Sequence, residues 1–172
     1  GATGLQGVTG PTGIAGPTGV TNGFLIPYAS NTPMAIVTDI TGAALTASTI
    51  AFGNSVTGVT FTGSNIDASN IDNMAYIIPK NYNLTDISVL ISITAPLNLT
   101  FGSMTVTAQI YTSINDLFTP LAGAIVNFAP LTGIIAIGTI ISATANGLNV
   151  PITAGSRVLL VISATTTGLE SS

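Results

Sequence analysis

Cysteine and histidine are absent from this 172-residue chain, and charged residues make up only 5% of it. Without these residue types there is no disulfide framework, no Ser-His or Cys-His nucleophile pair, and no thiolate or imidazole ligand for a metal. Lys80 is the remaining candidate amine base, but it stands beside Asn81 in a predicted turn, where a solvated side chain is the simpler interpretation. We therefore expect no catalytic residue, no cofactor and no enzymatic activity.

Positive charge is confined to Lys80 and Arg157, which excludes a basic surface for nucleic acid or for anionic lipid. Typical proteins have about 25% charged residues, whereas no charge at all falls between Asp116 and Arg157 here. Such a surface must be hydrated by serine, threonine and asparagine, and we expect part of it to be buried between subunits. The net charge of −4 indicates no particular partner.

The first 21 residues contain glycine at every third position. In collagen only glycine fits at the crowded axis where three polyproline-II chains wind together. The pattern therefore predicts a collagen-like triple-helix segment over residues 1–21 and a homotrimer; a flexible Gly/Thr-rich linker is the alternative. The period ends at Asn22, where an eighth glycine would stand. The periodic glycines are Gly1, Gly4, Gly7, Gly10, Gly13, Gly16 and Gly19.

The remaining sequence is typical of an all-β domain. Glu, Lys, Gln and Arg together number five, while Thr, Ile, Val, Ala and Gly dominate. Two runs, residues 86–94 and 103–111, alternate apolar and polar side chains and predict half-buried antiparallel strands. Shorter strand-length runs are separated by Gly, Pro, Asn and Asp; they cover residues 24–29, 35–38, 48–52, 58–62 and 74–78.

Three later runs, residues 123–129, 133–143 and 158–164, are apolar on both faces. A two-layer domain covers only one face of a strand, so we expect a neighbouring subunit to cover the other. The candidate trimer-interface residues are Ile135, Ile137 and Val161.

Two further features of this region are a predicted hairpin and a candidate membrane span. Asn146-Gly147 indicates a type I′ hairpin between two of the apolar strands. Residues 121–141 are long and uncharged enough to suggest a membrane span, but Asn127, Pro130 and Gly133 favour two buried strands joined by a turn. We therefore expect no membrane insertion.

Together these runs give about ten strands at the spacing of a sandwich or barrel. The predicted fold is an antiparallel jelly-roll sandwich over residues 22–168, because a closed double sheet removes exposed strand edges. Residues 169–172 hold the only glutamate and are expected to be a cloning remnant. Since the chain begins within collagen-like triplets, we expect it to be a fragment of a longer protein.

A duplicated Asn-Ile-Asp pattern offers the one candidate metal site. Its side-chain oxygens suit calcium, which takes six to eight oxygen ligands. The alternative is that these residues bond to their own backbone and form consecutive turns. A glycosidase-type carboxylate pair is disfavoured, because nothing here raises a carboxyl pKa or offers aromatic sugar platforms. The calcium candidates are Asn65, Asp67, Asn70 and Asp72.

The order of several segments after the collagen-like arm resembles the exosporium collagen-like glycoproteins of spore-forming bacteria. The domain looks closest to the C-terminal domain of the BclB type and is more distantly similar to the BclA type. The segments that carry the resemblance are Ile26-Pro27-Tyr28-Ala29-Ser30, Tyr76-Ile77-Ile78-Pro79-Lys80, Val106-Thr107-Ala108-Gln109-Ile110 with Phe118-Thr119-Pro120, and Val150-Pro151-Ile152-Thr153-Ala154-Gly155-Ser156-Arg157-Val158-Leu159-Leu160.

The resemblance implies a trimeric jelly roll of the complement-component (C1q) and tumour-necrosis-factor-like kind, at the tip of an extracellular filament on the spore surface. It also implies O-glycosylation of threonines at the third position of the triplets, where side chains point outward; plain tolerance of threonine is the alternative. These threonines are Thr3, Thr9, Thr12, Thr18 and Thr21.

We interpret the protein as a structural surface protein, a collagen-like stalk capped by a trimerising head. The alternative is a recognition or adhesion module, a C1q-like head or a phage fibre tip, that binds a host or matrix ligand. Its binding loops would be residues 31–33, 64–73 and 115–120.

Overall fold

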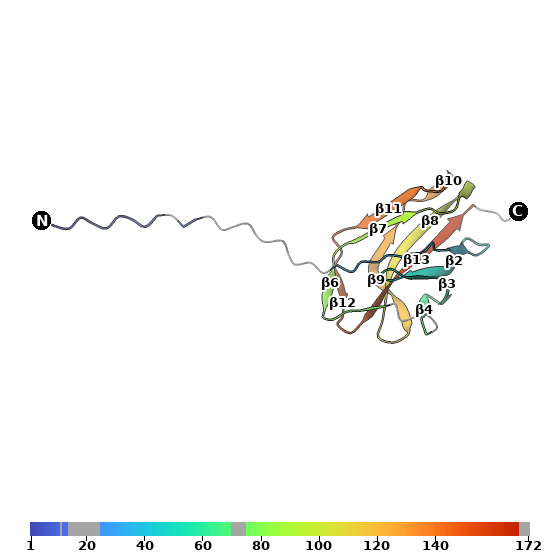
Figure 1. Cartoon of the computed structure of the whole chain (residues 1–172), viewed down its shortest axis with the longest axis horizontal. Helices are drawn as coiled ribbons and strands as arrows, with labels where there is room; N and C mark the ends of the chain where they lie inside the picture. The colour runs from blue at the N-terminus through green and yellow to red at the C-terminus, as the bar shows by residue number, and fades with distance from the viewer. Residues whose placement is uncertain (11, 14–24, 70–74, 169–172) are drawn as a thin grey trace.

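The computed structural model describes residues 1–10, 12–13, 25–69 and 75–168. Every regular element within these ranges is a β-strand, which confirms the all-β prediction. The described arm residues, 1–10 and 12–13, form no strand and are exposed, while the remainder forms a β-sandwich head (Figure 1). Within the described ranges, no helix is long and apolar enough to cross a membrane.

The head contains strands at most of the predicted places. Both alternating runs are confirmed, as β7 and as part of a much longer β8, because their period of two places one apolar face on the core. The strands are β1 (Val37–Thr38), β2 (Ala44–Ile50), β3 (Ser55–Thr62), β4 (Asn65–Asp67), β5 (Tyr76–Ile77), β6 (Tyr82–Leu84), β7 (Ile87–Ser92), β8 (Leu97–Ser113), β9 (Leu117–Asn127), β10 (Leu131–Ile135), β11 (Ile140–Ala145), β12 (Val150–Ile152) and β13 (Arg157–Thr167).

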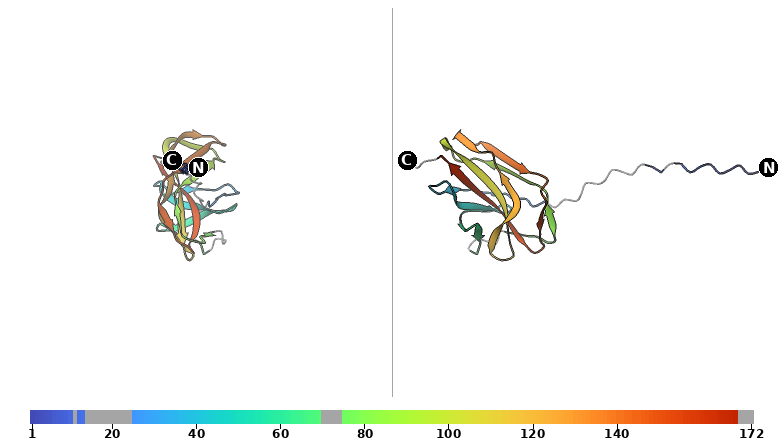
Figure 2. Two further views of the ribbon diagram at one scale, coloured as in Figure 1. Left: turned by 90° about the vertical axis from the view of Figure 1, so that its left-hand side faces the viewer. Right: turned by 180° about the vertical axis from the view of Figure 1, so that it is seen from behind.

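One sheet dominates the head and closes on itself. Its strands run in the order β1-β2-β3-β4-β9-β8-β13-β5, and β2 pairs in addition with β13. The six strands from β2 to β13 along this order therefore form a ring of antiparallel pairs, a small barrel. Seen from behind, β8, β9 and the red β13 lie side by side along its wall (Figure 2).

The inside of this ring is a separate hydrophobic core. Its buried members come from all six strands and include Val59 of β3, Phe118 of β9, and Leu159 and Val161 of β13. Val161 is 2% exposed within its own chain. The expectation that a neighbouring subunit covers this face of residues 158–164 is therefore wrong, because the barrel of the same chain covers it.

The second layer of the sandwich consists of two short two-stranded ladders. β7 pairs with β11, and β6 pairs with β12. Between this layer and the large sheet lies the main core, which takes the other face of β13, namely Val158, Leu160, Ile162 and Ala164. β13 is thus apolar on both faces because it separates two cores of one chain. This two-layer antiparallel arrangement is consistent with the predicted jelly roll.

The Asn146-Gly147 pair does not form the predicted hairpin. β11 before it and β12 after it do not pair with each other, because both pair with the continuous segment that contains β6 and β7. Gly147 has φ 66°, but Asn146 does not have the positive φ that a type I′ turn needs. The pair therefore interrupts a ladder, and the Leu148 N–H donates across it to the Thr85 carbonyl at 2.7 Å.

Two other predicted strands also differ. Residues 133–143 are divided between β10 and β11 by a turn in which Gly138 has φ 84°. The described part of the predicted strand at 24–29 contains only an isolated parallel bridge between Ala29 and Phe52. Pro27 has no N–H to donate to a ladder, so this stretch runs beside the sheet without joining it.

A substitution of Phe118 tests how much the barrel interior stabilises the head, because this side chain is 0% exposed there. Replacing it with alanine removes a buried ring and leaves a cavity, so Phe118→Ala should lower the free energy of unfolding by about 3–5 kcal/mol. Urea denaturation followed by circular dichroism measures this. The matched control is Phe101→Ala, because Phe101 is 87% exposed. Equal losses in the two variants would contradict the closed barrel.

Candidate functional site

Contacts within one chain do not explain why glycine stands at every third position of the described arm. At Gly1, Gly4, Gly7, Gly10 and Gly13, an added Cβ would meet no atom within 4 Å. None of these five glycines has a positive φ either, so the backbone does not require them. Gly16 and Gly19 lie outside the described residues.

The candidate glycosylation sites share the exposure of the arm. Thr3, Thr9 and Thr12 are exposed, while Thr18 and Thr21 lie outside the described residues. The three described hydroxyls are accessible to a modifying enzyme, and their glycosylation stays a prediction.

Only half of the candidate calcium site falls within the described residues. Asn65 and Asp67 stand at the two ends of β4, whereas Asn70 and Asp72 lie outside the described ranges. The Asp67 carboxylate accepts a hydrogen bond from the Ser69 N–H at 2.9 Å, as the turn alternative expects. The described ranges contain no group of three or more acidic side chains placed to hold a metal ion.

Asp39 caps a turn in the same way. Its Oδ1 accepts from the Thr41 hydroxyl at 2.6 Å and from the Thr41 and Ala43 N–H groups at 2.8 and 3.0 Å. The turn packs against the end of β13, where an added Cβ on Gly42 would stand 1.9 Å from the Thr166 carbonyl oxygen. The Thr41 hydroxyl bond, followed by the backbone donors, lowers the pKa of Asp39.

These two aspartates predict the acid response of the head. The Ser69 N–H lowers the pKa of Asp67 as the Thr41 hydroxyl lowers that of Asp39. A depressed pKa in the folded state adds stability above the unfolded value of about 3.9, which is lost as pH falls through the folded pKa. The midpoint of thermal unfolding should therefore fall on acidification below about pH 4. It should fall less in the double variant Asp39→Asn/Asp67→Asn, which keeps an acceptor oxygen at both turns.

Calorimetry from pH 7 down to pH 2 measures this difference. The comparison at pH 7 is the control, because there the variant shows the effect of losing charge without any titration. Parallel curves for the wild type and the variant would contradict the assignment of the acid response to these turns.

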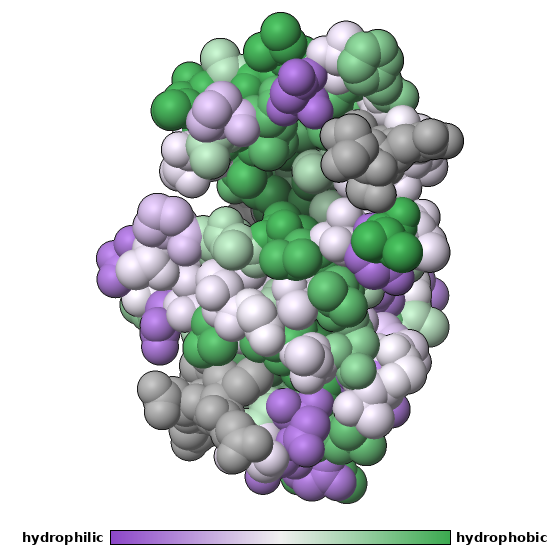
Figure 3. Space-filling view, turned by 90° about the vertical axis from the view of Figure 1, so that its right-hand side faces the viewer, coloured by the Kyte–Doolittle hydropathy of each residue, from purple (hydrophilic) through white to green (hydrophobic). Residues whose placement is uncertain are grey.

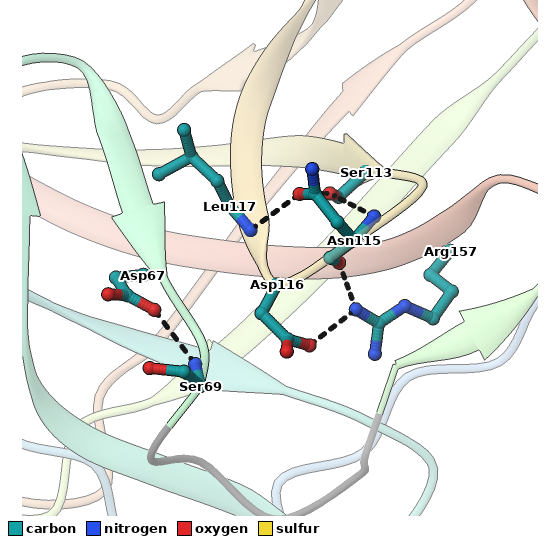
Figure 4. Close-up of polar contacts among 7 residues, drawn as sticks. All are labelled: Asp67, Ser69, Ser113, Asn115, Asp116, Leu117 and Arg157. Atoms are coloured by element: carbon teal, nitrogen blue, oxygen red, sulfur yellow. Dashed lines mark hydrogen bonds and ion pairs between the residues drawn. The ribbon is translucent and has the colours of Figure 1, made fainter.

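Arg157 anchors the β8–β9 turn to β13. Its Nη2 forms an ion pair of 2.7 Å with Oδ1 of Asp116 and donates to the Asn115 carbonyl (Figure 4). Its guanidinium lies 5.2 Å from the centre of the Phe118 ring. Asn115 Oδ1 accepts from the Ser113 hydroxyl, and the Leu117 N–H donates to the same oxygen at 2.9 Å. Sequence reasoning missed this cluster, because Arg157 and Asp116 are 41 residues apart.

The cluster is satisfied within its own chain and is suited to holding the turn. The Asp116 carbonyl also accepts from the Ala68 N–H at 2.7 Å, which fixes the end of β4 to the same turn. The other cation, Lys80, is exposed, with its Nζ 5.5 Å from the centre of the Tyr82 ring.

The three candidate interface residues have different surroundings. Val161 lies in the barrel core and is unavailable to a partner. Ile135 at the end of β10 is partly buried, and Ile137 in the β10–β11 turn is 65% exposed. A contact of these two isoleucines with a neighbouring subunit stays a prediction.

The head contains a cleft of about 1640 Å³, which we call the entrance groove. One wall is the entrance segment, residues 25–36, and the other is residues 82–95 with β7. The floor is the main core, including Ile110 of β8 and Leu160 of β13. From one end of the head, a hollow with hydrophobic side chains at its bottom separates the upper part from the middle (Figure 3).

The entrance groove was not predicted, although Pro27 and Pro33 in its wall are a signal that could have indicated it. Prolines keep the entrance segment out of the sheet, so no strand covers the core between this segment and β7. Tyr28 lines the groove, and its hydroxyl oxygen is buried without a hydrogen-bond partner among the described residues. Burial, with a smaller contribution from Tyr76, raises the pKa of Tyr28.

Comparison with known proteins gives one informative match. Collagen-like protein 1 of Acanthamoeba polyphaga mimivirus is 31% identical over 161 residues, which cover 86% of this chain and 17% of that protein. No protein-family model matches the chain. No solved structure matches it significantly. Because the match covers 86% of the chain, it includes most of the head and supports a collagen-like family for this chain.

Proposed function

We propose that this chain is the stalk end and the head of a trimeric structural surface protein. Three arms wind into a collagen-like helix, and three heads associate at its end. The proposed role involves no catalytic step and no cofactor. The chain spans 17% of the length of its viral relative, so the proposal concerns this chain and not the whole of that protein.

The glycine period of the arm is the observation that carries the proposal. In one chain, the described arm glycines have open space around them and no positive φ. Close approach of other chains is what would forbid a side chain at every third position and at no other. A flexible linker would gain nothing from such a strict period, so the geometry supports the triple helix over the linker.

Association of the heads would supply the alignment of three chains that the short arm lacks. Seven triplets form a short helix, and nucleating a helix costs conformational entropy before contacts repay it. Heads that associate would hold three arms close together and in register. The head is similar to part of a collagen-like protein, which supports a joint function of a collagen-like arm and this head.

An outer surface is the proposed location. The exposed threonines of the arm would carry sugars outward from the triple helix, and a chain without cysteine suits oxidising surroundings. We propose a surface filament, with the bacterial exosporium as one such setting. The relative comes from a virus, so the match does not favour a spore over another particle. The alternative, recognition of a host or matrix ligand, would use the loops at residues 31–33, 64–73 and 115–120. Residues 31–33 line the entrance groove, and residues 70–73 lie outside the described residues.

The variant Gly7→Ala tests the triple helix. A Cβ at this position meets nothing in one chain but would collide at the axis of three. We expect the collagen-type circular dichroism signal of the full chain to melt at a lower temperature in this variant. The neighbouring substitution Val8→Ala is the control, because its side chain points outward. Identical melting of the two variants, or a solution mass equal to one chain of 17.2 kDa, would contradict the proposal.

A further inference from the structure

We propose that the entrance groove is the binding site for a neighbouring copy of this chain. An apolar surface of that copy would occupy the position of a strand that the second layer lacks. This inference rests on the proposed trimer and adds to it the surface through which the heads associate. The groove, the chain length between arm and head, and the chemistry of its lining support it in turn.

The second layer of the sandwich has an open strand edge at the groove. Within the described ranges, β7 pairs with β11 alone, so its opposite edge has no strand partner. The entrance segment forms the other wall and is tied to the head by Ala29, whose N–H donates to the Ala51 carbonyl at 2.8 Å. An extended segment placed between the two walls could bond to the backbone of β7, as in β-strand addition.

The size of the groove suits a polypeptide better than a small molecule. Its volume of about 1640 Å³ exceeds the roughly 300–1,000 Å³ of typical small-molecule pockets.

The connection between arm and head places the groove beside the three-fold axis. Thr21 ends the last triplet, and Leu25, four residues later, begins the wall of the groove. Four residues span at most about 14 Å, so the three Leu25 residues of a trimer lie within a distance on the order of 30 Å. The surface around Leu25 therefore faces the other two copies, and the groove opens on that surface.

The lining of the groove matches the composition of the chain itself. Among the described residues that line it, Asp86 alone is charged, and apolar side chains such as Leu25 and Leu90 stand exposed at it. A charged partner would lose its hydration there without gaining an ion pair. A copy of this chain, in which only 5% of the residues are charged, would bury the groove without that loss.

Because the chain lacks cysteine, single cysteines can report on the groove. Leu90 is 66% exposed and lines the groove, whereas Ile114 is 85% exposed in the β8–β9 turn, outside it. In the trimeric full chain, we expect a maleimide to label Leu90→Cys at least tenfold more slowly than Ile114→Cys. Denaturation should make the two rates equal.

A charge at the same positions provides a second readout. Leu90→Asp should shift the full chain from trimer towards monomer in light scattering at low micromolar concentration, while Ile114→Asp should leave the mass unchanged. Both side chains are exposed in one chain, so neither variant should unfold the head, which circular dichroism checks.

The outcomes separate this inference from the proposed function. A wild-type trimer in which both cysteines label equally fast, or in which Leu90→Asp still forms trimers, would overturn the groove as the interface and leave the trimer standing. The groove would then be open to a different occupant, such as a peptide of another protein. A wild-type mass of one chain would overturn both proposals.

Discussion

The burial of both faces of β13 is the constraint on which the head depends. Alternate residues of this strand belong to two different cores, one between the sandwich layers and one inside the ring that β2 closes. A strand segment buried on both sides is a near-continuous apolar run, as residues 158–162 of β13 are. The long strands β8 and β9 also supply side chains to both cores.

The arm is under a different constraint, which no contact within one chain explains. Its described glycines are surrounded by open space, so their period has a physical reason only if other chains approach. Arm and head then have complementary roles. In the proposed trimer, the arm requires three chains in register, and the head offers a surface next to the junction that is apolar and incompletely covered. The similarity to a collagen-like protein covers 86% of the chain and therefore includes most of the head.

The prolines of the entrance segment connect these two constraints. Pro27 and Pro33 prevent the segment from completing the second layer as a paired strand, which leaves the edge of β7 open and the core accessible from one side. Open strand edges are a liability that proteins usually cover. In the proposed assembly, this edge is covered by a neighbour instead of by the chain itself.

The sequence by itself determined the properties that depend on local patterns. Glycine at every third residue predicts the collagen-like arm, composition predicts the all-β head, and alternation places β7 and part of β8, because side-chain period follows directly from backbone geometry. Only the tertiary structure decided what covers each apolar face. Val161 has the pattern of an interface residue but lies in the barrel of its own chain, and Asn146-Gly147 interrupts a ladder because β11 and β12 both pair with a distant segment. A pattern shows that a face is apolar; its partner depends on contacts between residues far apart in the chain, as for Arg157 and Asp116.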